Sequence, residues 1–313
     1  MGRSMMRSRD VATPERGRLD RHQAAGLHFR IGSAHEAVPG AVISSIKSIL
    51  LHVDATAQSV VRLQIARDLA ARHGAKVSAL FAATSELDDG RYAYSAGAAA
   101  DRAAELEQIR AGLQGRLSDD DRPVAWFDIV GERAARGFIE EAAYADLLVV
   151  GQQAAGTGTA GGAPAGFIES VILESGRPTL VIPVDGVADV IGQRVLVAWN
   201  GTVTAARALT AALPLLRGAA EVHVVSWSRI SPVAPFSRVG IAEYLQRHGI
   251  APLVHRREPS AHVGEELIAT AERLCVDLVV MGCYGRSRAS ERILGGATRT
   301  VLGRMPVPML MAH

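Results

Sequence analysis

An internal repeat of apolar segments restricts the fold of this chain more than any other feature. Residues 45–54 (SIKSILLHVD) align with residues 192–200 (GQRVLVAWN), and residues 146–151 (DLLVVG) align with residues 277–282 (DLVVMG). Each apolar run is short and is flanked by polar or glycine residues, which is the pattern of a buried strand. Because the same pattern occurs twice in the same order, the chain is predicted to contain two copies of one architecture.

The repeat predicts two domains, at residues 44–186 and 192–313. In each copy a helical segment follows the first strand, at about 57–73 and about 203–217. Strands that alternate with helices indicate parallel β-α-β units with right-handed crossovers. We therefore expect an α/β fold of two tandem, open, doubly wound parallel sheets, with any ligand at the carboxyl ends of the strands.

A glycine-rich motif follows the strand at 277–282. Gly282 and Gly285 are followed by nine residues and then by Gly295 and Gly296, where a second helical stretch begins. Glycines let backbone N–H groups approach a ligand closely, and the N-terminus of a helix favours an anion. The spacing therefore predicts a phosphate site in the second copy.

This G-x-x-G-x9-G spacing, the two copies and the terminal strand at 307–311 resemble a tandem protein of the universal stress protein family. The resemblance covers nearly everything after residue 44 and implies a topology like that of adenine nucleotide hydrolases and flavodoxin. It also implies that the last strands of the two copies, at 179–183 and 307–311, pair as an internal pseudo-dimer. Such pairing would cover two sheet edges that are otherwise open to aggregation.

In nucleotide-binding members of the family, an aspartate after the first strand lies on the adenine side, and the glycine motif holds ribose and phosphates. The resemblance implies that seven positions bind nucleotide here: Asn200, Met281, Gly282, Gly285, Gly295, Gly296 and Ala297. Two of them depart from the family pattern. Asn200 replaces the aspartate and keeps one acceptor oxygen, and Gly296 replaces a serine or threonine.

The loss of that hydroxyl would cost roughly 1.5–3 kcal/mol of phosphate binding. Arg286 and Arg288, together with Arg292, lie between the glycine pairs and either contact phosphate or form a solvated face. We expect weakened nucleotide binding, with ATP and Mg²⁺ as the ligand to test.

The first copy keeps Asp54 but breaks the glycine motif. Gly151 is followed by Gln152, Gln153 and Ala154, and residues 155–164 are a low-complexity stretch that lacks the lysine of a P-loop. We expect the first copy to have lost any nucleotide site and to serve as a scaffold or a differently specialised domain.

Residues 1–43 form a predicted disordered, arginine-rich arm. The first forty residues carry seven arginines against four acids and contain no apolar segment of a secretory signal. The arm is interpreted as solvated, or as an over-extended start with Met5 or Met6 as alternative starts; contact with nucleic acid or anionic lipid is the weaker interpretation. Elsewhere the charges nearly cancel, so neither nucleic acid nor a membrane is an expected partner.

The two cysteines and the histidines give no metal pattern. Cys275 and Cys283 do not form a CxxC motif, which favours a cytoplasmic location, and Cys283 is interpreted as a filler residue with a redox role as the alternative. His248, His255 and His262 are spaced by seven but lack a clustered carboxylate or cysteine partner.

The acidic residues near the strands are given structural roles. Asp146 and Asp277 are interpreted as turn residues, and the acidic pair Glu265 and Glu266 as exposed helix charge.

Three functions remain open at this stage. The leading hypothesis is a cytoplasmic stress-response protein that senses an adenine nucleotide in its second half and regulates unidentified protein partners. The alternative is a scaffold or interaction protein that no longer binds nucleotide. Under either hypothesis, whether two chains form a homodimer is left open. An enzyme is not expected, because Asn200 stands where an acid would help and no base is evident; weak ATP hydrolysis is the residual case.

Overall fold

The structure is a computed structural model that describes residues 46–83, 104, 107–115, 124–130, 134–153, 162–185, 190–227, 239–284 and 296–313. The predicted arm at 1–43 lies outside these residues. All described residues belong to one compact unit, Val42–His313. No helix among them is long and apolar enough to cross a membrane.

Strands and helices alternate along both copies of the repeat. The strands are β1 (Ser48–Val53), β2 (Lys76–Ala83), β3 (Ala125–Val130), β4 (Leu147–Gly151), β5 (Thr179–Ile182), β6 (Arg194–Ala198), β7 (Glu221–Trp227), β8 (Pro252–Arg257), β9 (Leu278–Gly282) and β10 (Met309–Ala312). The helices are α1 (Gln58–His73), α3 (Ala134–Ala142), α4 (Phe167–Glu174), α5 (Val203–Leu216), α6 (Ile241–Arg247), α7 (Val263–Arg273) and α8 (Gly296–Arg304).

The described strands form one sheet in the order β3-β2-β1-β4-β5-β10-β9-β6-β7-β8. Every neighbouring pair is parallel except β5 and β10. The order 3-2-1-4-5 in the first half returns in the second half as 8-7-6-9-10 read from the other edge. The α/β fold with doubly wound parallel strands is therefore confirmed.

The junction between β5 and β10 joins the two five-stranded sets into a continuous sheet. The strands run antiparallel, with Met309 opposite Val181 and Leu310 opposite Leu180. The expected pairing of the last strands is thus confirmed, although the division into two domains at 44–186 and 192–313 stays a prediction.

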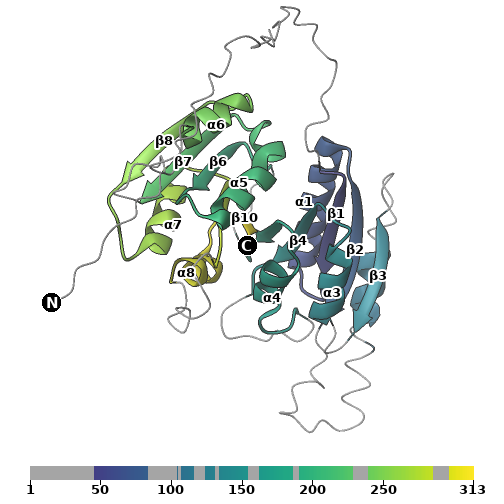
Figure 1. The fold of residues 1–313 in the computed structure, drawn as a ribbon. Helices are drawn as coiled ribbons and strands as arrows, with labels where there is room; N and C mark the ends of the chain where they lie inside the picture. The colour runs from purple at the N-terminus through teal and green to yellow at the C-terminus, as the bar shows by residue number, and fades with distance from the viewer. Residues whose placement is uncertain are drawn as a thin grey trace, which may run out of the picture. The chain divides into compact units, whose positions relative to one another are not determined.

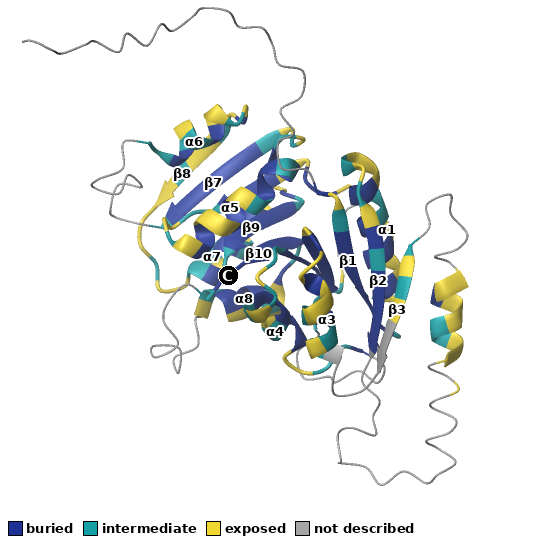
Figure 2. Ribbon diagram, turned by 45° about the vertical axis from the view of Figure 1, so that its right-hand side comes forward, coloured by how far each residue is buried: buried dark blue, intermediate teal, exposed yellow. Residues whose placement is uncertain are grey.

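Helices cover both faces of the sheet (Figure 1). Side chains of α1, α5 and α6 pack with one face in one apolar cluster, and those of α3, α4, α7 and α8 pack with the other face in a second cluster. Figure 2 shows the consequence, because the central strands are buried while the helices keep exposed outer sides. This layering explains why the strands are apolar throughout.

Two aspartates fix the amino ends of the central strands. The Asp277 carboxylate accepts hydrogen bonds from the backbone N–H groups of Gly192, Gln193 and Arg194 at 2.6–3.0 Å. In the first half Asp146 accepts from the N–H groups of Lys47 and Ser48 at 2.8 and 3.0 Å. Both carboxylates thus accept hydrogen bonds from backbone N–H groups at a turn, as the sequence predicts. They do not face a site at the carboxyl ends of the strands.

Candidate functional site

The carboxyl ends of β6 and β9 lie side by side and bring together several of the predicted site residues. Ala198 is paired with Met281 in this part of the sheet, so Asn200 follows β6 near the end of β9. The Asn200 side chain is exposed, and its Oδ1 accepts hydrogen bonds from the backbone N–H and the hydroxyl of Thr202 at 3.1 and 2.7 Å. The oxygen expected to serve a ligand is therefore already used, and Asn200 offers its Nδ2 donor instead.

Thr202 in turn begins helix α5. Its hydroxyl accepts a hydrogen bond from the N–H of Ala205 at 3.3 Å, which makes it the N-cap of the helix. Asn200 and Thr202 thus form one hydrogen-bonded turn that fixes the start of α5 against the end of β6. A ligand at this edge would meet a rigid rather than an adaptable surface.

Gly282 has a packing role that the glycine motif did not reveal. A methyl group on its Cα would overlap the backbone of Thr204 and Ala205 in the first turn of α5. The glycine therefore allows β9 to approach this helix closely. The preceding Met281 is 6% exposed and packs in the cluster on the α7 and α8 face, so only its backbone is available to a ligand.

Gly296, the first residue of α8, is exposed where a phosphate was predicted. Among the described residues, a methyl group on its Cα would meet no atom within 4 Å. Ala297, in contrast, packs against α7, because a methyl group on Gly264 would come within 3.0 Å of the Ala297 Cα and carbonyl oxygen. Four predicted positions, and Arg292 with them, lie outside the described residues: Gly285, Arg286, Arg288 and Gly295.

Three residues at this edge were missed from the sequence. Arg207 of α5 donates from Nη1 to the His313 carbonyl oxygen at 2.9 Å, and the His313 ring lies 3.2 Å from the Cys283 carbonyl oxygen and packs edge-on to Tyr284. Tyr284 has a φ of 52°, in the left-handed region. The parallel pairing of β10 with β9 could have placed His313 here, whereas Arg207 carried no signal.

Cys283 is a buried filler residue, as expected. It is 1% exposed, and its Sγ lies 3.3 Å from the Ala312 carbonyl oxygen. Burial raises the pKa of the thiol to about 12. The thiolate needed for redox chemistry is therefore disfavoured.

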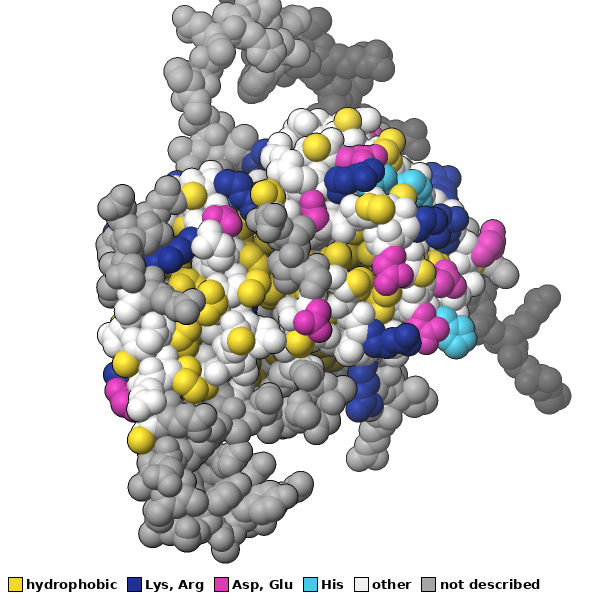
Figure 3. All heavy atoms as spheres, turned by 180° about the vertical axis from the view of Figure 1, so that it is seen from behind, with side chains coloured by type: hydrophobic (Ala, Val, Ile, Leu, Met, Phe, Trp, Pro, Cys, Tyr) yellow, Lys and Arg dark blue, Asp and Glu magenta, His cyan; other side chains and the backbone are white. Residues whose placement is uncertain are grey.

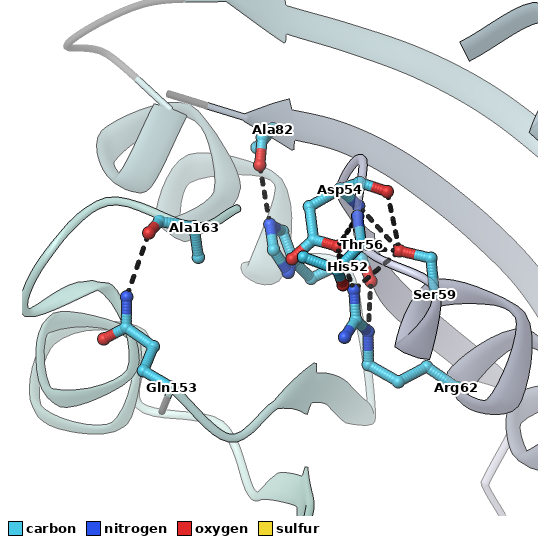
Figure 4. A network of polar contacts seen from close by, with 8 residues as sticks. All are labelled: His52, Asp54, Thr56, Ser59, Arg62, Ala82, Gln153 and Ala163. Carbon is cyan, nitrogen blue, oxygen red and sulfur yellow. Dashed lines mark hydrogen bonds and ion pairs between the residues drawn. The ribbon is translucent and has the colours of Figure 1, made fainter. Parts of the chain in front are cut away.

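In the first half the corresponding turn is closed by an ion pair (Figure 4). Asp54 accepts from the N–H and hydroxyl of Thr56 at 3.0 and 2.5 Å, which repeats the arrangement of Asn200 and Thr202. Arg62 of α1 then adds Nη2 bonds to Asp54 at 2.8 Å and to Ser59 at 2.7 Å, with a bond from Nε to the His52 carbonyl oxygen at 3.1 Å. The guanidinium and the carboxylate are 2% and 6% exposed.

Arg62 also fills the space above Gly151, the counterpart of Gly282. A methyl group on Gly151 would overlap the Nη1 atom of Arg62. The first half therefore places a buried side chain where the second half places the backbone of α5. Beyond it, Gln153 donates to the Ala163 carbonyl oxygen at 3.0 Å (Figure 4).

Burial and charge set the protonation of this cluster. Burial by itself would raise the pKa of Asp54, but the attraction of Arg62, with further help from His52 and Thr56, outweighs it and lowers the pKa to about 2. Burial lowers the pKa of His52 to about 4. The His52 ring packs 4.5 Å from the Phe167 ring, and its Nε2–H donates to the Ala82 carbonyl oxygen at 2.8 Å. At neutral pH the cluster holds one carboxylate, one guanidinium and a neutral imidazole.

The remaining candidates have ordinary structural roles. The Trp227 indole N–H donates to Glu266 at 2.5 Å, so Glu266 is not simply exposed helix charge as predicted. His248 contacts Arg217, and His262 precedes α7. In the described part of the chain, no group of three or more His, Cys, Asp or Glu side chains is placed to hold a metal ion.

The charge distribution gives no single-sign surface on the face seen in Figure 3, where basic and acidic side chains are interspersed. This agrees with the net charge of +2 for the whole chain. Association driven by a basic patch, as with nucleic acid, has no support on this face.

Comparison with known proteins gives a family match for the second half and supports the fold of both halves. The family model described as "Universal stress protein family" matches residues 192–313, and no curated protein matches the sequence. A universal stress protein from Archaeoglobus fulgidus DSM 4304 is similar in structure, with a TM-score of 0.66 and 20% identity over 85% of this chain and 95% of that chain. A functionally unknown protein from Pseudomonas aeruginosa PAO1 gives a TM-score of 0.54 and 15% identity over 85% and 92%. At these identities the two structures indicate a shared fold and nothing about ligands.

Proposed function

Since residues 192–313 match the model of the universal stress protein family, we propose that this half of the chain binds an adenine nucleotide and acts as a sensor or regulator. ATP with Mg²⁺ is the proposed ligand, and the bound state would be read by protein partners. Binding without turnover is part of the proposal, because Asn200 is an uncharged amide and offers neither a base nor a metal-binding acid.

The observation that carries the proposal is the exposed first residue of α8, at the carboxyl edge of the sheet. Ligands of doubly wound sheets bind at this edge, and a helix N-terminus presents unpaired N–H groups to an anion. Gly296 begins α8, is exposed and has no other described residue within 4 Å of the position of a Cβ atom. The backbone there can hold phosphate without the hydroxyl that the family pattern has.

Each residue of the edge has a proposed part in binding. Asn200 would donate from Nδ2 to the adenine or ribose, since its oxygen is bonded to Thr202. Arg286 and Arg288 are proposed to pair with the phosphates on the basis of their sequence position alone. Mg²⁺ bound together with the nucleotide would neutralise part of the phosphate charge.

The first half is proposed to act as a scaffold. Its counterpart of the site contains the buried pair of Arg62 and Asp54, and Arg62 packs directly on Gly151. A phosphate or base entering there would have to displace a guanidinium that makes three hydrogen bonds. One nucleotide per chain is therefore expected.

Calorimetric titration of the chain with ATP and Mg²⁺ tests the proposal. We expect one site that is lost in Gly285→Leu and unchanged in Ala154→Leu, which alters the aligned position of the first half. Equal affinity in the wild type and Gly285→Leu would show that the assigned site is wrong. No binding at millimolar ATP would favour the alternative, a scaffold or interaction protein that keeps the fold without the ligand.

A further inference from the structure

Two histidines on neighbouring strands of the second half face each other through their ring nitrogens. His223 is the third residue of β7, and His255 lies on β8, the edge strand. The His223 Nδ1 and the His255 Nε2 are 3.0 Å apart, and the ring centroids are 5.2 Å apart. Because β7 residue 225 is opposite residue 255, the two side chains come from the same face of the sheet.

A carboxylate lies behind the first of these rings. Glu221 Oε1 is 3.3 Å from the His223 Nε2, on the opposite side of the ring from His255. His223 is 3% exposed, and its Nε2 is buried without a hydrogen bond of good geometry. A proton on Nε2 is favoured by the neighbouring carboxylate, which leaves the lone pair of Nδ1 directed at His255.

We propose that His223 and His255 form a two-histidine site for a divalent transition metal such as Zn²⁺, with solvent completing the coordination. Zn²⁺ binds imidazole nitrogen at about 2.0–2.1 Å, so two nitrogens in a tetrahedral site lie about 3.3 Å apart. The observed 3.0 Å needs only a small separation of the rings. Glu221 then has the place of the carboxylate that orients a ligating histidine through its other nitrogen.

A change of tautomer at His255 frees both facing nitrogens for a metal. Metal binding breaks the hydrogen bond between the rings, and the proton on the His255 Nε2 is taken up at Nδ1 through solvent. Both rings then remain neutral ligands.

The charges around the pair limit its affinity. Arg194 pairs with Glu221 at 2.7 Å, and Arg257 and Arg273 act on His255, so three cations oppose a metal dication. With only two protein ligands, the site is expected to bind more weakly than four-ligand structural zinc sites. It also lies away from the proposed nucleotide edge, because His223 is near the amino end of β7.

Titration of the full chain with ZnCl₂ at pH 7.5, followed by calorimetry, tests the site. We expect the wild type to bind one more equivalent of Zn²⁺ than His255→Gln, whereas His262→Gln, which removes an exposed histidine next to α7, should match the wild type. Any Zn²⁺ bound elsewhere on the chain, including by the three histidines of residues 1–43, is common to all variants and cancels in the comparison. Glu221→Gln should weaken the site by about 10- to 100-fold.

A second readout identifies the ligands independently of folding defects. With Cu²⁺, which binds nitrogen ligands more tightly than Zn²⁺, electron paramagnetic resonance should detect two imidazole nitrogens in the wild type and in His262→Gln. Circular dichroism confirms that each variant is folded. Zinc stoichiometry and affinity that are the same in folded His255→Gln and in the wild type would overturn the proposal.

Discussion

The buried pair of Arg62 and Asp54 allows a quantitative prediction of its own. Replacing Arg62 by Met keeps a long side chain above Gly151 and removes the charge. Asp54 would then be a buried carboxylate without its cation. Breaking a buried pair in this way costs about 3–5 kcal/mol in the free energy of unfolding.

The pH dependence of the free energy of unfolding gives a second estimate of what this ion pair contributes. In the wild type the pKa of Asp54 falls from 3.8 to about 2, and at 1.36 kcal/mol per pKa unit this corresponds to about 2 kcal/mol. Because the folded-state pKa is depressed, this stability is present above about pH 4 and is lost as the pH falls towards 2. In Arg62→Met, burial acts without the guanidinium and raises the pKa of Asp54, so the stability that the variant loses relative to the wild type should become smaller as the pH falls from 7.

Urea unfolding followed by circular dichroism, at pH 7 and at steps down to pH 3, measures both effects. The double variant Asp54→Asn/Arg62→Met is the control, since the second half has Asn200 at the aligned position and keeps the same turn. It should recover most of the stability lost in the single variant. A loss below 1 kcal/mol in Arg62→Met, or a double variant that is no more stable than the single one, would refute the argument.

Three further predictions concern packing, thiol reactivity and acid stability. Gly282→Ala should cost at least about 1–3 kcal/mol, because the added methyl overlaps the backbone of α5; thermal unfolding measures this, and Gly296→Ala, which meets open space, should be neutral or slightly stabilising. A disulfide reagent at pH 8 should modify one thiol in the folded protein, the exposed Cys275, and both in guanidinium, since Cys283 is buried with a raised pKa; rapid modification of two thiols in the folded state would contradict this. The pKa of His52 is lowered from 6.5 to about 4, so the unfolded state gains a proton that the folded state does not, and stability should fall by about 3 kcal/mol as the pH drops from 6.5 to 4. His52→Phe should reduce that loss in urea unfolding, and an unchanged pH profile would contradict the assignment.

The repeated strands and the turn aspartates could be predicted from the sequence, because each rests on a local pattern that occurs twice. The pairing of the last strands was an expectation from the family resemblance. Asp146 and Asp277 are a clear case, since each precedes an aligned strand and bonds the backbone of the adjacent one. The candidate site was harder to predict. The Asn200 oxygen accepts two hydrogen bonds from Thr202, two residues further on, and such a turn is visible only in the three-dimensional structure.

The role of Arg62 could not be predicted from the sequence for a different reason. In the sequence it is one arginine in a helix with several charges, and nothing local distinguishes it from Arg67 or Arg72. Its role arises because β4 brings Gly151 beneath α1, a contact between residues 89 positions apart. His223 and His255 are likewise 32 positions apart in the sequence and meet only because β7 pairs with β8. The seven nucleotide-binding residues themselves remain predictions.

Because β5 and β10 belong to the same chain, their antiparallel pairing does not depend on protein concentration. A fragment with only one half would expose a terminal strand edge, and two such fragments would have to find each other at their bulk concentration. In the intact chain the two edges are tethered, so their encounter is intramolecular and has a high effective concentration. Pairing of these strands is therefore independent of dilution, and the partner of each edge is fixed as the other half of the same chain rather than a second identical copy.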